Sequence, residues 1–255
     1  MLCLGYNNLS AENTIYLKSE VRVRISLYSS TVLNPGKCNV KDSRLDDVDG
    51  ITKAKKRTYV QVEIVGEDAA LDSDVILVPK ENRTDLILAD LEFVETRLGR
   101  GPQAEEKAVL EKMKAALEKE GFISSVGLTD DEKKLIAGYG LLTLKPVILF
   151  EAADLDDRDG LLRRALDEGG YTSFFTTGEK ETRAWLIKKG TTAWEASGAI
   201  HSDIQHGFIR AEIISLDDFL SCGGESRAKQ AGKQRLEQKT YVMQPADITT
   251  FRFNK

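Results

Sequence analysis

The stretch YTSFFTTGEKETRAWLIKKGTT, Tyr171 to Thr192, decides the organisation of the C-terminal part of the chain. On either side of GEKE, apolar and polar residues alternate in two short runs. A period of two is the pattern of a strand with one buried and one solvated face, and two such runs around a short glycine-containing connection are typical of a β-hairpin. We therefore predict a β-hairpin in this stretch.

Further helix and strand signals follow the hairpin. The segment KKGTTAWEASGAIH, residues 188–201, carries threonines suited to cap a helix N-terminus, so it predicts a helix. FIRAEIISL, residues 208–216, predicts a strand, and TYVMQPADITTFRFN, residues 240–254, predicts two short strands around a turn at Pro245. Strand, strand, helix, strand and further strands is the element order of a β-grasp domain.

The front part of the chain begins with strand signals. Alternation in EVRVRISL, residues 20–27, and in TYVQVEIV, residues 58–65, predicts two strands. Between them, NPGK at 34–37 and the polar run KDSRLDDVDG at 41–50 predict a turn and a loop. The run DVILVP, residues 74–79, predicts a further apolar segment that ends at a proline.

Helical periodicity follows. RTDLILADLEFVETRLGR, residues 83–100, and AEEKAVLEKMKAALEKEG, residues 104–121, place apolar residues near helical spacing and are separated by glycine and proline, so they predict an antiparallel helical hairpin. Thr129 is predicted to cap a third helix. LKPVILFEAADLDD, residues 144–157, predicts a buried strand that leads into an acidic loop, and GLLRRALDEG, residues 160–169, predicts a short helix.

The C-terminal stretch resembles a known domain. SFFTTGEKETRAWLIKKGTTAWEASGAIHSDIQHGFIRAEIISLDDFLSCGG, followed by AGKQRLEQKTYVMQPADITTFRFN, closely resembles the TGS-like domain that ends the YchF, or Obg-like, ATPases. That family belongs to the translation-factor branch of the P-loop GTPases and prefers ATP. The departures are Gln238, where the family usually has glycine, and Pro245 to Asp247, where it has a D-G-D turn.

The front half is similar to the same family in the same order. SRLDDVDGITKAKK resembles the segment after switch I, TDLILADLEFVETRL the first helix of the coiled-coil insertion, and LTDDEKKLIAGYGLLTLKPVILF the return into the nucleotide domain. The resemblance implies an α/β plus α+β fold. It consists of a reduced P-loop-type GTPase-like α/β domain (residues 1–83 and 139–170), an inserted helical hairpin (84–138) and a TGS-like β-grasp domain (171–255).

The loop GYNNLSAENT, residues 5–14, resembles the phosphate-binding loop of this family but lacks its chemistry. A working P-loop, G-x-x-x-x-G-K-[ST], supplies a lysine to the outer phosphates and a hydroxyl to magnesium. By this resemblance, the loop is a vestigial nucleotide site. It keeps two residues of the family's loop and has other residues in place of the second glycine, the lysine and the serine. These five positions are Gly5, Asn8, Ser10, Ala11 and Glu12.

Two other nucleotide elements depart from the family in the same way. GEDAAL, residues 66–71, lacks the glycine of the family's D-I-A-G-L segment, and its base-reading N-x-x-E falls at Ala152 to Leu155. We therefore predict no catalytic residues, no cofactor and no hydrolysis, in a degenerate YchF-like protein. The alternative is a regulatory switch that still grips ATP or GTP, and a third is a decaying or artificially assembled gene whose product folds only at its C-terminus.

Composition limits the partners. The chain has 255 residues, 41% of them hydrophobic, and a net charge of −5, so no global positive field draws it to nucleic acid or anionic membrane. From Tyr171 onward, however, twelve lysines and arginines face ten carboxylates. No segment approaches eighteen consecutive apolar residues and the three cysteines lie far apart, which predicts a cytoplasmic protein without membrane contact or disulfide framework.

The expected partner is the ribosome or RNA, recognised by charge and stacking without reading of DNA sequence. The competing interpretation is an ordinary charged surface with core aromatics. His201 and His206 have no third ligand at convincing spacing, so no metal is predicted and a capping or packed histidine is favoured. The candidate partner-binding residues are Lys188, Lys189, Phe208, Arg210, Lys229, Lys233 and Arg235.

Overall fold

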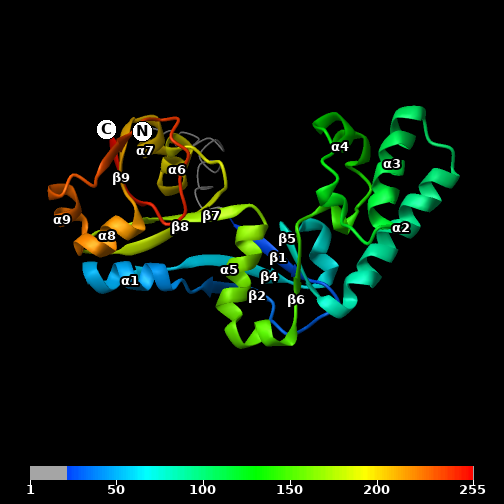
Figure 1. Cartoon of the computed structure of the whole chain (residues 1–255), viewed down its shortest axis with the longest axis horizontal. Coiled ribbons are helices and arrows are strands. Elements are labelled where there is room, and N and C mark those ends of the chain that lie inside the picture. The colour runs from blue at the N-terminus through cyan, green and yellow to red at the C-terminus, as the bar shows by residue number, and fades with distance from the viewer. Residues whose placement is uncertain (1–21, 255) are drawn as a thin grey trace, which may run out of the picture. The chain divides into compact units, whose positions relative to one another are not determined.

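The computed structural model describes residues 22–254, which divide into two compact units (Figure 1). Residues 22–43 and 59–172 form one unit, called here the N-terminal unit. Residues 44–58 and 173–254 form the other, called here the C-terminal unit. The chain has a mixed α/β architecture with one sheet in each unit.

The N-terminal unit is built on a five-stranded sheet with the order β2-β4-β1-β5-β6. β1, β4, β5 and β6 run parallel, and β2 is antiparallel to β4 at one edge. All five residues of β5 are buried, as expected for a central strand covered on both faces. The strands are β1 (Val23–Leu27), β2 (Gly36–Val40), β4 (Val60–Val65), β5 (Val75–Pro79) and β6 (Val147–Phe150).

The helices of this unit agree with the sequence patterns. α2 (Arg83–Gly99) and α3 (Ala104–Leu117) pack together around a core that includes Val94, Leu110 and Met113. The predicted hairpin of helices is confirmed. A capping box at Thr129 and Glu132 begins α4 (Asp130–Ile136), as predicted, and α5 (Arg158–Glu168) packs against β2, β5 and β6. Short 3-10 turns are η2 (Glu67–Asp72), η3 (Lys80–Asn82), η4 (Ile123–Ser125), η5 (Leu142–Leu144) and η6 (Ala152–Asp157).

The predicted loop over residues 41–50 is wrong, and the turn predicted at residues 34–37 ends earlier, where β2 begins. Gly36–Val40 forms β2 and pairs with β4, and Ser43–Thr52 forms helix α1. Aspartates and a glycine give this helix a weak intrinsic preference. Leu45 and Val48, three residues apart, are both completely buried. Burial of one face in the tertiary structure therefore outweighs the local propensity that the sequence pattern reflects.

The C-terminal unit contains a six-stranded sheet with the order β10-β9-β11-β7-β8-β3. β7 and β8 are neighbours, which confirms the predicted hairpin. Helix α6 (Ala193–Ile200), also predicted, packs against β8 and β9 around Phe174, Ile213 and Phe251. The strands are β3 (Arg57–Thr58), β7 (Tyr171–Thr176), β8 (Thr182–Lys188), β9 (Phe208–Ile214), β10 (Arg235–Glu237) and β11 (Ile248–Phe253).

The end of the chain differs from the two predicted terminal strands. Only β11 forms, while Val242 makes a single antiparallel bridge to Thr192. Pro245 has no N–H for a ladder, and Ala246 follows it at φ 60°, so the backbone turns here instead of extending. Strand β10 and three short helices were not predicted: α7 (Ser202–His206), α8 (Leu216–Cys222) and α9 (Glu225–Gln230).

A segment from the front half completes the C-terminal sheet. β3 pairs in parallel with β8, and the N–H of Thr182 donates to the carbonyl of Lys56 at 2.9 Å. The hydroxyls of Thr52 and Thr182 lie 2.8 Å apart, and Arg57 contacts Asp46 at 3.1 Å. Residues 44–58 are therefore an integral part of this unit.

Candidate functional site

The predicted vestigial nucleotide loop lies outside the described residues. Gly5, Asn8, Ser10, Ala11 and Glu12 all precede residue 22, so their role stays a prediction. The sheet of the N-terminal unit nevertheless has an edge that can be inspected. In open α/β sheets, ligands bind outside the carboxyl ends of parallel strands, at a point where the strand order reverses. β1 is central and has β4 and β5 as its neighbours, so a ligand of this sheet would bind at the carboxyl end of β1.

No helix lies between β1 and β2. The chain leaves β1 at Leu27 and enters β2 at Gly36 through a short irregular connection. In this connection Ser29 has φ 48°, and its backbone N–H donates to Oε2 of Glu67 at 2.9 Å. The hydroxyl of Ser26 donates to the carbonyl of Gly66 at 3.1 Å. A carboxylate of the chain itself therefore accepts the second backbone N–H beyond β1.

Other carboxylates surround the same edge. The pKa of Tyr28 is raised by burial first, and then by the charges of Glu67, Asp85 and Asp90. The ammonium of Lys80, just after β5, pairs with Oε1 of Glu151 at 2.5 Å, and this hydrogen bond raises the pKa of Lys80. The edge thus presents several negative charges, and the lysine nearest to β5 is already paired.

The positions of the missing base reader fall in the turn after β6. Ala152 to Leu155 lie within η6, where Oδ2 of Asp154 accepts the backbone N–H of Glu151 at 2.8 Å. This hydrogen bond, followed by the charge of Arg164, lowers the pKa of Asp154. Asp154 therefore caps its own turn. The segment GEDAAL, residues 66–71, lies in the 3-10 turn η2 and the glycine that precedes it.

Asp90 is a buried carboxylate that the sequence analysis did not single out. Its side chain on α2 accepts the N–H groups of Leu142 and Thr143 and the hydroxyl of Thr143, at 3.2, 2.7 and 2.7 Å. Burial outweighs these hydrogen bonds and raises the pKa of Asp90. Asp90 thus joins α2 to the chain that returns toward β6. Its separation of more than fifty residues from its partners leaves no local signal.

The candidate partner-binding residues do not form one cluster in the C-terminal unit. Lys188 and Lys189 are exposed where β8 turns toward α6. β8 is separated from β9, which carries Arg210, by two intervening strands, a lateral distance of roughly 14 Å. The two lysines therefore do not share one small cluster with Arg210.

Register places Arg210 and Arg235 on opposite faces of the sheet. Arg235 is the cross-strand partner of Ile213, which belongs to the core under α6, and Leu236 is the partner of Glu212. Because neighbouring side chains alternate, Arg235 points toward the α6 side while Arg210 and Glu212 point to the other side. On the α6 side, the guanidinium of Arg235 lies over the ring of Tyr241, 5.4 Å from its centroid.

Two further candidates have structural partners. Lys233 contacts Oδ1 of Asp218 at 3.2 Å. Phe208 is buried, and its ring centroid lies 5.9 Å from that of Phe251, so it faces the core and is not available for stacking on a base. Lys229 is exposed on α9, and its charge contributes to lowering the pKa of Glu212.

The sequence analysis missed the role of Arg252. Arg210 and Glu212 lie two residues apart on β9 and share one strand face, where the structure puts them in contact at 3.5 Å. Arg252, directly opposite Arg210 on β11, donates two hydrogen bonds to Glu212, from Nε at 2.9 Å and Nη2 at 2.8 Å. These bonds lower the pKa of Glu212, whose side chain is only 5% exposed. Strand register, which was not predicted, is the information that identifies this pair.

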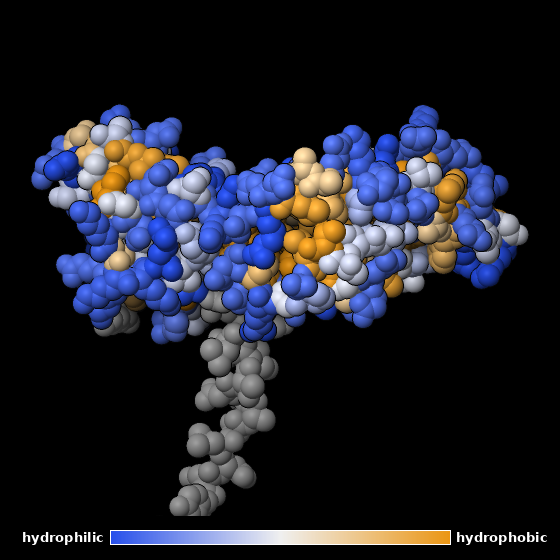
Figure 2. Space-filling model, turned by 90° about the horizontal axis from the view of Figure 1, so that it is seen from below, coloured by the Kyte–Doolittle hydropathy of each residue, from blue (hydrophilic) through white to orange (hydrophobic). Residues whose placement is uncertain are grey.

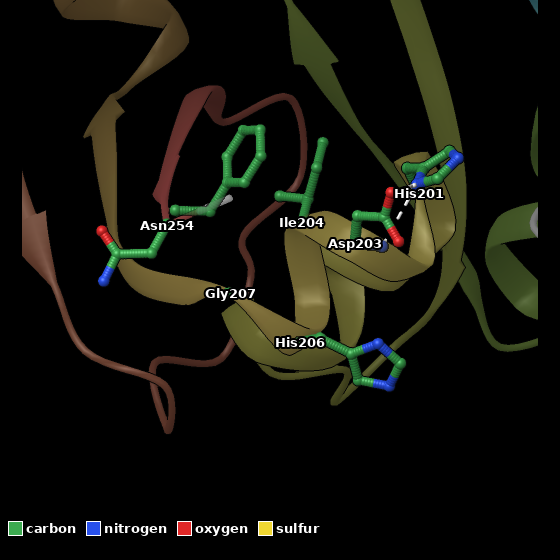
Figure 3. A pocket seen from close by; sticks show the side chains of 7 residues that line it. His201, Asp203, Ile204, His206, Gly207 and Asn254 are labelled. Carbon is green, nitrogen blue, oxygen red and sulfur yellow. Dashed lines mark hydrogen bonds and ion pairs between the residues drawn. The ribbon is translucent and has the colours of Figure 1, made fainter.

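The two histidines line an open groove of about 780 Å³, shown in Figure 3. Nδ1 of His201 accepts the backbone N–H of Asp203 at 3.1 Å and so caps α7, which confirms the capping role. His206 points away from this pair. At Gly207 a side chain would meet the backbone of Asn254, so the chain end lies tightly against this turn. Within residues 22–254, no group of three potential ligands is placed to hold a metal ion.

Apolar side chains are exposed on both units, and the face in Figure 2 is mostly hydrophilic with several apolar areas. In the C-terminal unit the exposed apolar residues are Trp194, Ile209, Leu236, Val242 and Phe253. None of the described helices has the length and apolar character needed to cross a bilayer.

Comparison with known proteins assigns the family. A family model described as "YchF-GTPase_C: Protein of unknown function (DUF933)" matches residues 171–254. The ribosome-binding ATPase YchF of Pasteurella multocida is 33% identical in an alignment that covers 76% of this chain and 69% of that protein. The chain belongs to the YchF/Obg-like ATPase family.

Other YchF proteins support the same assignment. The ribosome-binding ATPase YchF of Haemophilus influenzae is 34% identical over 233 residues, which cover 67% of this chain. This chain spans 64% of the length of that relative. The structure of the Schizosaccharomyces pombe YchF GTPase matches with a TM-score of 0.69 at 19% identity, covering 91% of this chain and 98% of that one. The mixed α/β fold of this chain thus resembles a YchF structure.

Proposed function

We propose that this chain is a degenerate, non-hydrolysing YchF-family protein that associates with ribosomes or RNA through its C-terminal unit. In this proposal the N-terminal unit is a reduced P-loop-type α/β domain with an inserted helical hairpin, and the C-terminal unit is a TGS-like β-grasp domain. The relatives that carry the name ribosome-binding ATPase support the partner, and with it a location in the cytoplasm.

The observation that carries the loss of hydrolysis is the hydrogen bond between Ser29 and Glu67 at the carboxyl end of β1. Phosphate sites in this type of fold depend on backbone N–H groups and on the positive end of a helix that follows the strand. Among the described residues, β1 leads directly into β2 without such a helix. The N–H of Ser29 is directed at a carboxylate instead.

The negative charges at the carboxyl end of β1 also oppose the binding of a nucleotide. A nucleotide triphosphate approaching the end of β1 would be repelled by the carboxylates of Glu67 and Asp85, whose charges also raise the pKa of Tyr28. Like charges a few ångströms apart repel by about 1 kcal/mol or more, even in a strongly screening environment. Phosphoryl transfer relies almost entirely on cationic stabilisation and positioning, so this arrangement opposes it.

The partner side of the proposal rests on the C-terminal unit. From Tyr171 onward its basic residues exceed its carboxylates, twelve to ten, although the whole chain is acidic. Lys188, Lys189, Arg210, Lys229 and Lys233 support contact with phosphate groups or with acidic ribosomal protein surfaces. Few phosphates would be met, so binding to RNA alone should be weak and sensitive to salt.

The experiment combines two measurements on one preparation. Fluorescent ATP and GTP analogues are titrated into the protein with magnesium, and co-sedimentation with ribosomes is measured at low and high salt. The expected result is ribosome binding at low salt without saturable nucleotide binding or phosphate release. Magnesium-dependent turnover would overturn the loss of hydrolysis. Saturable nucleotide binding without sedimentation would favour the regulatory switch.

A further inference from the structure

Two arginines lie directly opposite each other on the sheet face away from α6. Arg210 on β9 and Arg252 on β11 are cross-strand partners, and each side chain is about half exposed, at 46% and 52%. Like charges in directly opposed positions destabilise an antiparallel pair. A face that keeps such a pair requires a compensating group, and here that group is Glu212.

Glu212 holds both guanidinium groups from below. Its carboxylate receives the two hydrogen bonds from Arg252 and contacts Nη2 of Arg210, and the amide of Gln234 donates to Oε2 at 3.4 Å. A guanidinium has five N–H donors in a rigid plane. Arg252 directs two of them at Glu212, so three remain for a ligand on the solvent side. The buried carboxylate therefore fixes the orientation of the guanidinium while its outer edge stays accessible.

The charge of the surroundings favours an anion. Besides the two arginines, the charge of Lys229 helps to lower the pKa of Glu212, and the charge of Glu225 helps to raise the pKa of Arg252. In this group, three cations exceed two carboxylates. Leu236, the cross-strand partner of Glu212 on β10, lies on the same face and is 58% exposed. An apolar side chain beside two oriented guanidinium groups suits an anion attached to a less polar body.

We propose that Arg210 and Arg252 form a clamp for the phosphodiester backbone of RNA, that Leu236 contacts the adjoining ribose or base, and that Glu212 is the positioning residue of the clamp. Paired N–H donors in the plane of a guanidinium match two oxygens of a phosphate group. This inference rests on the proposed association with ribosomes or RNA and specifies its site and chemistry.

Glu212→Gln gives the sharpest test, because two explanations predict opposite signs. If charge alone draws RNA to this face, removal of a negative charge strengthens binding. In the clamp, the neutral amide holds the arginines less firmly, so binding of a labelled short oligouridine should weaken about threefold in fluorescence anisotropy. An unchanged or tighter complex of a folded Glu212→Gln variant contradicts the proposal.

The arginines supply a second readout that folding alone does not move. Arg252→Gln and Arg210→Gln should each weaken oligouridine binding about tenfold and reduce the slope of log affinity against log salt by about 0.7, the value for one single-strand phosphate contact. Arg252→Lys keeps the charge but loses the planar fork, so its affinity should fall while its salt slope stays. Arg100→Gln, an exposed arginine in the N-terminal unit, is the matched control and should leave binding unchanged.

Failure of the clamp can be separated from failure of the proposed function. Ribosome co-sedimentation that persists while the unmutated protein binds no oligouridine overturns the clamp and retains the ribosome as partner. Loss of both in the unmutated protein overturns both proposals. Binding of an acidic peptide, such as oligoglutamate, with equal or higher affinity than oligouridine would also contradict an RNA clamp. Thermal melting of each variant shows whether it is folded.

Discussion

The two units of this chain use buried carboxylates in opposite ways. In the N-terminal unit, Asp90 is surrounded by neutral donors, and burial raises its pKa. In the C-terminal unit, Glu212 is held by Arg252 and its pKa is lowered. The first carboxylate joins elements of the fold together, whereas the second orients cations at the surface. The comparison supports the proposal that the N-terminal unit retains an architecture and the C-terminal unit a binding surface.

Under the proposed function, the packing of the parallel sheet explains how the architecture would outlast a nucleotide site. β5 is buried along its whole length, and its packing does not depend on the loops at its carboxyl end. Phosphate binding in such folds comes from those loops, which tolerate change far better than the core does. The connections at this edge can therefore change while the sheet order is kept.

Asp90→Ala should produce the largest effect. It leaves the N–H groups of Leu142 and Thr143 without their acceptor and should lower the free energy of unfolding of the N-terminal unit by roughly 3 kcal/mol. Denaturant unfolding measures this loss. Asp85→Ala, exposed on the same helix, should cost less than about 0.5 kcal/mol. If the two units divide structure and binding as proposed, Asp90→Ala leaves ribosome co-sedimentation unchanged below the unfolding transition.

Reversal of two adjacent lysines tests the same division from the other side. Lys188→Glu with Lys189→Glu should reduce ribosome co-sedimentation about tenfold at low salt, because two phosphate contacts become repulsive. Lys133→Glu with Lys134→Glu reverses an adjacent exposed pair on α4 and is the matched control in the N-terminal unit. Equal losses from both double variants would show that the binding surface is not confined to the C-terminal unit.

Thr182→Val tests the contribution of residues 44–58 to the C-terminal unit. The substitution removes the hydroxyl that lies 2.8 Å from the hydroxyl of Thr52 and should destabilise this unit by about 1 kcal/mol. Thr250→Val, a partly exposed position on β11, should be nearly neutral. For the same reason, an isolated fragment of residues 171–255 should melt at a lower temperature than the C-terminal unit of the whole chain. Identical melting of fragment and chain would contradict the role of residues 44–58.

The smallest expected effect is on the pH dependence of stability, to which Glu212 and Asp90 should contribute with opposite sign in acid. Glu212 has a lowered pKa, so its stabilising contribution is present above the unfolded value near 4.5 and is lost as the pH falls through the folded pKa. Asp90 has a raised pKa, so the stability that it contributes falls as the pH rises above the ordinary value of 3.8. Stability measured against pH for Glu212→Gln and Asp90→Asn, each relative to the unmutated chain, should show these opposite slopes. Slopes of the same sign would contradict the contrast.

Local patterns predicted the hairpin of β7 and β8, helices α2, α3 and α6, and the cap at Thr129, because each depends on residues that are close in sequence. Long-range pairings were not predictable in this way. Ser29 and Glu67 are separated by 38 residues, and Glu212 and Arg252 by 40. The clamp requires the register of β9 and β11, and the helix over 43–52 requires a buried face that propensity does not reveal. The resemblance assigned the family, but only the structure separated the candidate cations into different places.

The most direct test of the central claim is the affinity for ribosomes measured with and without magnesium-ATP or magnesium-GTP. Two ligands that are coupled through one protein must change each other's affinity by the same factor. If the N-terminal unit no longer binds nucleotide and the C-terminal unit binds the ribosome by itself, the two dissociation constants agree, with a ratio of about 1. A change of about fivefold or more on addition of nucleotide would contradict the claim and would establish a nucleotide-dependent switch.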